Sequence, residues 1–171
     1  DIQSKGLELL EESGFAQYEV SAFSKPGKAS QHNLNYWRFG DYLGIGAGAH
    51  AKVTSLNLTH DDRHQTRYRK TRIPTDYLNA SLNLATEPSY RIGEEVIARG
   101  EIGIEFLMNV LRLKQGVSES LFEQRTGLAI SHIEPQLSEL RQLGLIEKNT
   151  LCTTEKGHLF LNTVLEKFTN S

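Results

Sequence analysis

Residues 32–50 read HNLNYWRFGDYLGIGAGAH and carry the most distinctive chemistry of the chain. The first six hold a histidine, two amides, a tyrosine and the only tryptophan, and they predict a short helix or a structured loop. Gly44, Gly46 and Gly48 stand among small residues, which is typical of a strand and turn that a ligand or another backbone approaches closely. A dinucleotide fingerprint needs G-x-G-x-x-G at the start of a helix, and the residues after Gly48 do not predict a helix.

The residues before this stretch predict a helix followed by a strand. Residues 6–13 (GLELLEES) are typical of the end of a helix, with Gly14 in the C′ position. Residues 18–23 (YEVSAF) alternate and predict one strand, and residues 25–28 (KPGK) predict a turn. Helix, glycine and strand form the second half of a β–α–β unit, so we expect the chain to be a fragment of a longer protein.

The residues after it predict a strand over 52–58, a basic run and a helix near 76–84. The basic run, residues 63–72 (RHQTRYRKTR), holds five bases and no acid, whereas the whole chain has a net charge of -2. This balance excludes a uniformly basic nucleic-acid binder. The run suits phosphate, a propionate or anionic lipid, and it equally suits a solvated loop or an edge strand.

The second half predicts three helices, a small hairpin and a closing helix, in the order of a winged helix. The second helix covers 118–125, the hairpin joins 145–147 to 151–153, and Thr154 can cap the closing helix. The third helix, 130–143, carries two acids and one base, so no DNA partner is expected. The apolar positions of the first, third and closing helices are Ile104, Leu107, Met108, Leu111; Ile130, Ile133, Leu137, Leu140, Leu143; and Leu159, Phe160, Val164, Leu165, Phe168.

Composition limits the class of protein. The chain has 171 residues, of which 38% are hydrophobic and 23% charged, enough for a core in one domain or two small ones. Its one cysteine excludes a disulfide framework and a cysteine-based metal site, and it favours a reducing, cytoplasmic location. We expect Cys152 to be a small buried residue of the hairpin. No apolar run approaches the roughly 20 residues of a membrane helix.

The histidines suggest one candidate ligand. His32 could bind haem iron axially while Tyr36 and Trp37 cover the porphyrin face, and the alternative is a surface loop whose aromatic side chains pack on the core. His50, His60 and His64 lack metal-binding spacing, and His132 and His158 are expected to be exposed.

The chain resembles the C-terminal part of the oxygen-independent coproporphyrinogen III oxidase family of radical S-adenosylmethionine proteins, and most of all its HemW branch of haem chaperones. The resemblance covers most of the chain, in the order of the family. Its matching stretches are YEVSAFSKPG (18–27), the 32–50 stretch, RKTRIPTDYL (69–78), EFLMNVLRL (105–113) and TTEKGHLFLN (153–162).

The resemblance implies a mixed α/β (α+β) fold in three parts. Residues 1–60 would be the last strand–helix elements of a partial (β/α) radical S-adenosylmethionine barrel. Residues 61–90 would be a basic connecting segment with a helix, and residues 91–171 a winged-helix-like domain. The resemblance also implies S-adenosylmethionine and a [4Fe–4S] cluster in the full-length protein only, because the cysteine motif of the family is absent from this chain.

The resemblance also assigns site residues. His32, Asn33, Tyr36 and Trp37 match the HNxxYW motif that is implicated in haem binding, with His32 as the iron ligand. Ile45, Gly46 and Ala47 match positions that line the adenosylmethionine cavity. Arg67 and Arg69 are the candidate partners of the haem propionates, because guanidinium groups match carboxylates. No catalytic residue is assigned.

The function implied is binding of haem and its delivery to respiratory haem proteins, with peripheral membrane association left open. One alternative is oxidative decarboxylation of coproporphyrinogen III to protoporphyrinogen IX, and another is a non-catalytic winged-helix interaction module. Whether the full-length protein is an enzyme stays open at this point. This chain alone is expected to be inactive, because one cysteine cannot hold a four-iron cluster.

Overall fold

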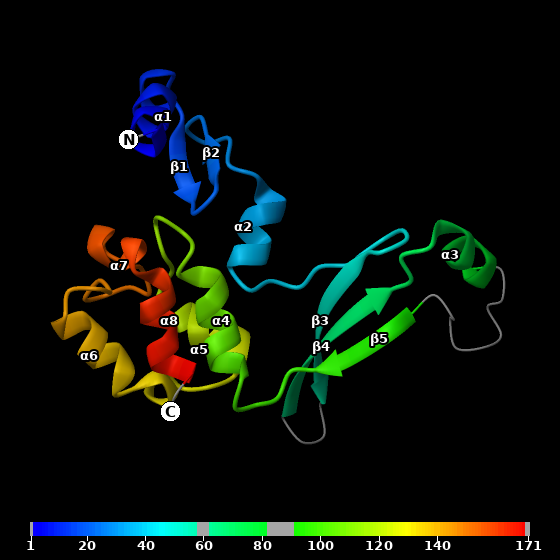
Figure 1. Cartoon of the computed structure of the whole chain (residues 1–171). Helices are drawn as coiled ribbons and strands as arrows, with labels where there is room; N and C mark the ends of the chain where they lie inside the picture. Colours follow the sequence, from blue (N-terminus) through cyan, green and yellow to red (C-terminus); the bar gives the residue numbers. More distant parts are fainter. Residues whose placement is uncertain (1, 58–61, 82–90, 170–171) are drawn as a thin grey trace. The chain divides into compact units, whose positions relative to one another are not determined.

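The computed structural model describes residues 2–57, 62–81 and 91–169, which form two compact units. The helical unit joins Asp1–Gly40 to Gly103–Ser171, and the sheet unit is Asp41–Ile102. The helical unit contains α1 (Ile2–Glu12), β1 (Ala16–Glu19), β2 (Ala22–Ser24), α2 (Gln31–Trp37), α4 (Ile102–Val110, from the last residue of the sheet unit), α5 (Glu119–Thr126), η1 (Ile130–Ile133), α6 (Gln136–Gln142), α7 (Glu155–Leu159) and α8 (Leu161–Thr169) (Figure 1).

The segment after α1 is a hairpin and not the single strand expected over 18–23. β1 and β2 pair antiparallel, with Ala16 opposite Ser24. The reason is local, because the Glu19 carboxylate accepts hydrogen bonds from the backbone N–H of Ser21 at 3.0 Å and from its hydroxyl at 2.8 Å. These two bonds close a tight turn between the strands. The helix end at Gly14 (φ 78°) and the turn at 25–28 are confirmed.

Three phenylalanine rings form the centre of the helical unit. Phe106 contacts Phe39 and Phe122 edge to face, with ring centroids 5.7 and 5.3 Å apart. Leu107 is buried as expected, but Met108 is 50% exposed. Met108 was assigned to the wrong face of α4, because the buried stripe runs through residues 102, 106, 107 and 110. Other fully buried side chains of this core are Leu111, Leu137, Leu140, Ile146, Leu151 and Val164.

The expected third helix over 130–143 is two elements, η1 and α6. Pro135 disfavours helical backbone at the residue before it, and Glu134 is accordingly extended at φ -90° and ψ 149°. The end of α5 at Gly127, in the left-handed region, is confirmed. The hairpin expected to join 145–147 to 151–153 is also confirmed, by the bridge between Ile146 and Thr153.

The closing helix is also divided, into α7 and α8. The Thr154 hydroxyl accepts a hydrogen bond from the N–H of Gly157 at 3.0 Å, so the expected cap is confirmed. Leu159 and Phe160 were wrongly assigned to the apolar side, since both are exposed at the break between the helices. Cys152 is free and buried, as expected.

The sheet unit is a three-stranded antiparallel sheet in the order β3 (His50–Asn57), β4 (Asp62–Lys70) and β5 (Arg91–Val96), with α3 (Pro74–Ser81) after β4 (Figure 1). The strand expected over 52–58 corresponds to β3. Most of the basic run is β4, the central strand, so the alternative of a loop or an edge strand is wrong. β5 was missed, because its RIGEEV sequence is polar.

The described residues mix helices and strands, as expected. Every strand pair among them is antiparallel, and the barrel and winged-helix descriptions, with boundaries at residues 60 and 90, stay predictions. His60 and the end of the helix expected near 76–84 lie outside the described residues. Within the described ranges, no helix is long and apolar enough to cross a membrane.

Candidate functional site

The HNLNYW motif forms α2, which begins after Ser30. The Ser30 hydroxyl accepts a hydrogen bond from the N–H of Asn33 at 3.4 Å. His32 and Tyr36 are one helical turn apart and exposed, whereas Asn33 and Trp37, also one turn apart, are half-buried. The short helix expected here is confirmed, and it separates the motif into an outward pair and an inward pair.

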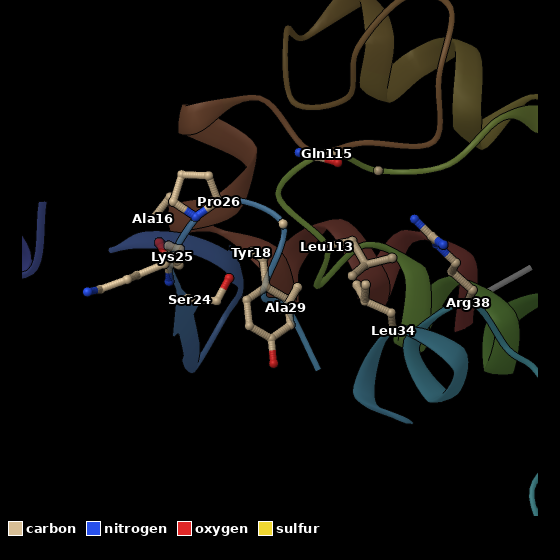
Figure 2. A pocket seen from close by; sticks show the side chains of 13 residues that line it. Ala16, Tyr18, Ser24, Lys25, Pro26, Ala29, Leu34, Arg38, Leu113 and Gln115 are labelled. Atoms are coloured by element: carbon tan, nitrogen blue, oxygen red, sulfur yellow. The ribbon is translucent and has the colours of Figure 1, made fainter. Parts of the chain in front are cut away.

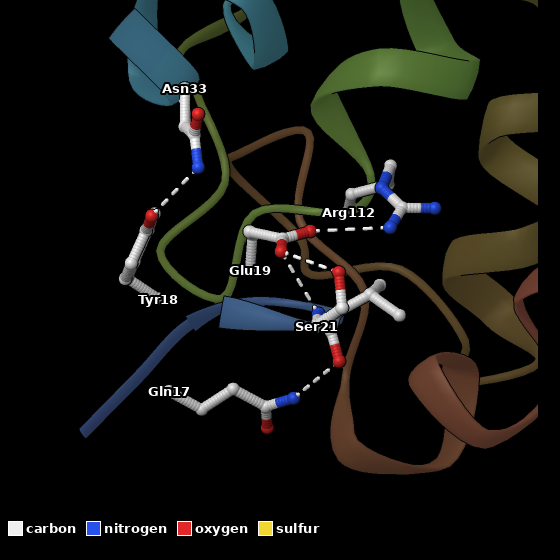
Figure 3. Close-up of polar contacts among 7 residues, drawn as sticks. Gln17, Tyr18, Glu19, Ser21, Asn33 and Arg112 are labelled. Carbon is white, nitrogen blue, oxygen red and sulfur yellow. Dashed lines mark hydrogen bonds and ion pairs between the residues drawn. The ribbon is translucent and has the colours of Figure 1, made fainter. Parts of the chain in front are cut away.

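The inward pair contacts neighbouring elements of the helical unit. The Asn33 side-chain amide donates a hydrogen bond to the Tyr18 hydroxyl at 3.1 Å (Figure 3). The guanidinium of Arg112 lies over the Trp37 ring, 4.4 Å from its centroid. Tyr36 meets Trp37 edge to face at 4.8 Å. Trp37 therefore packs within the unit, while Tyr36 borders the solvent.

A part-buried ion pair between Glu19 and Arg112 lies beside Trp37. The Glu19 side chain is 3% exposed, and its second carboxylate oxygen is 3.2 Å from Nη2 of Arg112 (Figure 3). With the two bonds from Ser21, this carboxylate has three donors, which offsets the cost of its burial. Neither Glu19 nor Arg112 was predicted from the sequence. The only signals were an acid within an apparent strand and a base directly after an apolar helix.

A pocket of about 170 Å³ lies on another side of α2, between the β1–β2 hairpin, the 25–29 turn and the 113–116 segment (Figure 2). Leu34 of α2 and Arg38, the residue directly after α2, also line it. Small-molecule sites usually hold roughly 300 Å³ or more. This pocket is thus too small for a porphyrin.

A larger, open groove of about 860 Å³ lies between α1, the hairpin and α7, and includes none of the predicted site residues. His158 and Lys114 line it together with apolar side chains such as Leu10 and Phe23. His158 is half-buried and not exposed as expected. Burial first, then the charges of Lys114 and Arg112, lower the pKa of His158.

The glycine-rich stretch is a turn in the sheet unit and not a strand, with only Tyr42 bridged to β3. A Cβ on Gly44 would lie 2.1 Å from the carbonyl oxygen of His50, so the close approach expected here is made by the chain's own backbone. Gly46 has a φ of 100° and donates its N–H to the Tyr77 hydroxyl at 3.2 Å. Ile45 is 89% exposed, and Ala47 is exposed. Ile45 and Ala47 therefore form an exposed apolar tip on this turn.

Arg67 and Arg69 lie two residues apart on β4 and share one face of the sheet. Arg67 stands between Lys52 and Glu95 in the register, and Arg69 between His50 and Gly93. A Cβ on Gly93 would lie 2.9 Å from Nε of Arg69, so the missing side chain lets this arginine lie across β5. Arg69 is exposed, and its guanidinium suits a carboxylate ligand.

The donor set of the chain does not fit an iron–sulfur cluster. Cys152 is the only cysteine, and its thiol contacts the carbonyl oxygen of Lys114 at 3.3 Å inside the core. Burial and the charge of Glu147 raise the pKa of this thiol, against a smaller lowering by Lys114. Within the described ranges, no group of three or more His, Cys, Asp or Glu side chains is arranged to hold a metal ion.

The predicted site residues thus belong to two units. His32, Asn33, Tyr36 and Trp37 are in the helical unit, and the remaining five, Ile45, Gly46, Ala47, Arg67 and Arg69, are in the sheet unit. The imidazole of His32 is exposed and is of a type that can bind haem iron axially, and Tyr36 lies one helical turn further along the same face.

Comparisons with known proteins add independent findings. The family described as the HemN C-terminal domain matches residues 98–160. The chain is 41% identical over 170 residues to the "Heme chaperone HemW" of Haemophilus influenzae, a match that covers 98% of this chain and 41% of that protein. It is 40% identical over 173 residues to the "Heme chaperone HemW" of Escherichia coli, covering 98% of this chain and 42% of that protein. The chain spans about two fifths of the length of these curated relatives.

A solved structure shares the fold. Coproporphyrinogen III oxidase (HemN) from Escherichia coli, a radical SAM enzyme, aligns with a TM-score of 0.61 over 98% of this chain and 40% of that chain. The two sequences are 16% identical, so this likeness concerns the fold alone.

Proposed function

Because this chain belongs to the oxygen-independent coproporphyrinogen III oxidase family, in its HemW branch, and contains the C-terminal domain of that family, we propose that the protein binds haem on α2 and passes it to respiratory haem proteins. The relatives of about 40% identity are named haem chaperones. The oxidase structure, at 16% identity, supports the fold and favours no reaction. Haem binding and delivery is therefore better supported than oxidative decarboxylation of coproporphyrinogen III.

The observation that carries the proposal is the exposed pair on α2. His32 presents an imidazole to solvent, and Tyr36 lies one turn further along the same face. An imidazole beside an aromatic ring suits the iron and the edge of a porphyrin. Both side chains are exposed, and Tyr36 also contacts Trp37 edge to face.

Haem titration of His32→Ala tests the proposal. We expect the Soret band of the complex to shift or disappear, because the variant lacks the axial nitrogen. His132→Ala is the matched control, since His132 is an exposed histidine of the same unit and should bind haem as the wild type does. His158→Ala tests the large groove in the same series. If it changes the spectrum and His32→Ala does not, haem occupies the groove and the proposal for α2 is wrong.

The propionates are the second part of the proposal. Arg69, and Arg67 beside it on β4, would pair with the two carboxylates, since guanidinium forks match them. Arg69→Glu should weaken haem binding without moving the Soret band, because it alters no iron ligand. Arg99→Glu is the control, as Arg99 is an exposed arginine of the same unit outside the basic run. If Arg69→Glu and Arg99→Glu bind haem with equal affinity, the proposed role of the arginines in binding the propionates is wrong.

In the full-length protein, Ile45, Gly46 and Ala47 would contact S-adenosylmethionine at the turn before β3. With a [4Fe–4S] cluster, this cofactor supplies radical chemistry. A cytoplasmic location, peripheral docking to a membrane and the absence of a DNA partner complete the proposal. The proposed absence of a DNA partner is supported by Arg141. This residue is the one base of α6, and it is already ion-paired with Glu119 at 2.5 Å.

A further inference from the structure

We propose that Tyr18, Glu19 and Arg112 form a clamp that positions α2 for haem binding. In this assignment His32 and Tyr36 contact the haem, whereas Asn33 and Trp37 are the points where the clamp holds the helix. The inference rests on the proposed function and extends it to three residues outside the motif. Tyr18, Glu19 and Arg112 are positioning residues, since none lies on the exposed face of α2.

The first contact of the clamp holds the first turn of α2. The Asn33 amide donates to the Tyr18 hydroxyl at 3.1 Å. Tyr18 lies where the pairing of β1 with β2 is irregular, between Gln17 and Glu19. Such irregularities redirect side chains. The backbone of Tyr18 is itself fixed, because its carbonyl accepts from the N–H of Lys114 at 3.1 Å.

The second contact holds the last turn of α2. Glu19 is bridged to Leu113 through the backbone, which sets Arg112 beside its carboxylate. The ion pair at 3.2 Å anchors Nη2 of Arg112, and the central carbon of the same guanidinium lies 4.4 Å from the centroid of the Trp37 ring. A cation over an indole ring is an attractive contact whose strength grows with burial. The tilt of Trp37 therefore depends on a carboxylate on another element.

The clamp is not an arrangement chosen for stability alone. Nε of Arg112 and Nε1 of Trp37 are both buried and lack a hydrogen-bond acceptor among the described residues. Buried unpaired donors are unfavourable, and removing a carboxylate as deeply buried as that of Glu19 from water is costly. The clamp retains these unpaired donors and the buried charge despite their cost, and it holds Trp37 in one orientation. We therefore assign it a positioning role.

Trp37 fluorescence tests the clamp without haem, because it is the only tryptophan in the chain. Glu19→Gln and Arg112→Met should each make Trp37 more accessible to acrylamide. Arg141→Met is the matched control, since it removes another ion pair of the same unit and should leave the quenching of Trp37 unchanged. If Glu19→Gln and Arg112→Met quench as the wild type does, the clamp does not hold Trp37 and the proposal fails.

Haem titration then tests the positioning role. Glu19→Gln and Arg112→Met should each weaken haem binding by about tenfold, as expected for losing one charge-assisted contact. The Soret band should stay at the wild-type position, because His32 remains. The double variant should be little weaker than either single variant, since both changes break one linked contact. Arg112→Lys should recover the midpoint of denaturant unfolding but not the affinity, because lysine keeps the charge and lacks the planar stack.

The outcomes separate the clamp from the proposed function. If the wild type binds no haem, the proposed function fails, and the fluorescence still decides whether the clamp orders Trp37. If the wild type binds haem and the clamp variants bind equally well, the positioning role is wrong. Additive losses in the double variant, or full recovery by Arg112→Lys, would also contradict it.

Discussion

At the scale of single residues, the surroundings of His158 predict a pH-dependent stability. Burial, reinforced by Lys114 and Arg112, holds its pKa below the ordinary value of 6.5. The unfolded chain therefore binds a proton more readily than the folded chain. The contribution of neutral His158 is fully present above pH 6.5 and is lost as the pH falls below it.

We predict that the denaturant midpoint of the wild type decreases as the pH is lowered from about 7.5 to about 5.5. His158→Gln should reduce the slope of the midpoint against pH. His132→Gln is the control, since His132 is exposed and should leave the slope unchanged. A His158→Gln slope equal to that of the wild type would show that other groups set the acid response.

At the scale of elements, the caps of two helices differ in a way that can be measured. The Thr154 hydroxyl accepts from the N–H of Gly157 and donates to the carbonyl oxygen of Gly144 at 2.7 Å, so it joins α7 to the end of α6. Ser118 occupies the same position before α5, but its side chain makes no capping bond.

We predict that Thr154→Ala lowers the free energy of unfolding by about 1 kcal/mol or somewhat more, whereas Ser118→Ala changes it by less than about 0.5 kcal/mol. Thermal or denaturant unfolding of the two variants measures the difference. Equal losses would mean that helix propensity, and not the capping bond, sets the stability of these termini.

At the scale of the whole molecule, one cysteine fixes the redox chemistry of the chain. Cys152 is buried in the core, and a [4Fe–4S] cluster needs several thiolates. After anaerobic incubation with iron and sulfide, we predict neither cluster absorbance nor 5′-deoxyadenosine from added S-adenosylmethionine. Escherichia coli coproporphyrinogen III oxidase, a radical SAM enzyme, is the positive control. Deoxyadenosine formed by the 171-residue chain would overturn this prediction.

Local sequence signals determined much of the secondary structure. Ser30 and Thr154 start helices, Gly14 and Gly127 end them, and proline before glycine makes the turn at 25–28. These signals work because caps and turns depend on bonds between residues two to five apart. The HNLNYW motif, the basic run and the family could be recognised for the same reason, since each is a contiguous pattern.

The tertiary structure decided which residues of each sequence pattern are buried and which are exposed. Nothing in the local sequence shows that Glu19 turns the chain between β1 and β2, or that its partner is Arg112, 93 positions away. Exposure was misjudged at Met108 and Leu159 because a helical stripe gives a period without fixing which side meets the core. The motif of α2 has the same property. Its sequence gives the spacing of His32, Asn33, Tyr36 and Trp37, but only packing against Tyr18 and Arg112 assigns two of them inward and two outward, because burial is set by the distant elements that cover a helix.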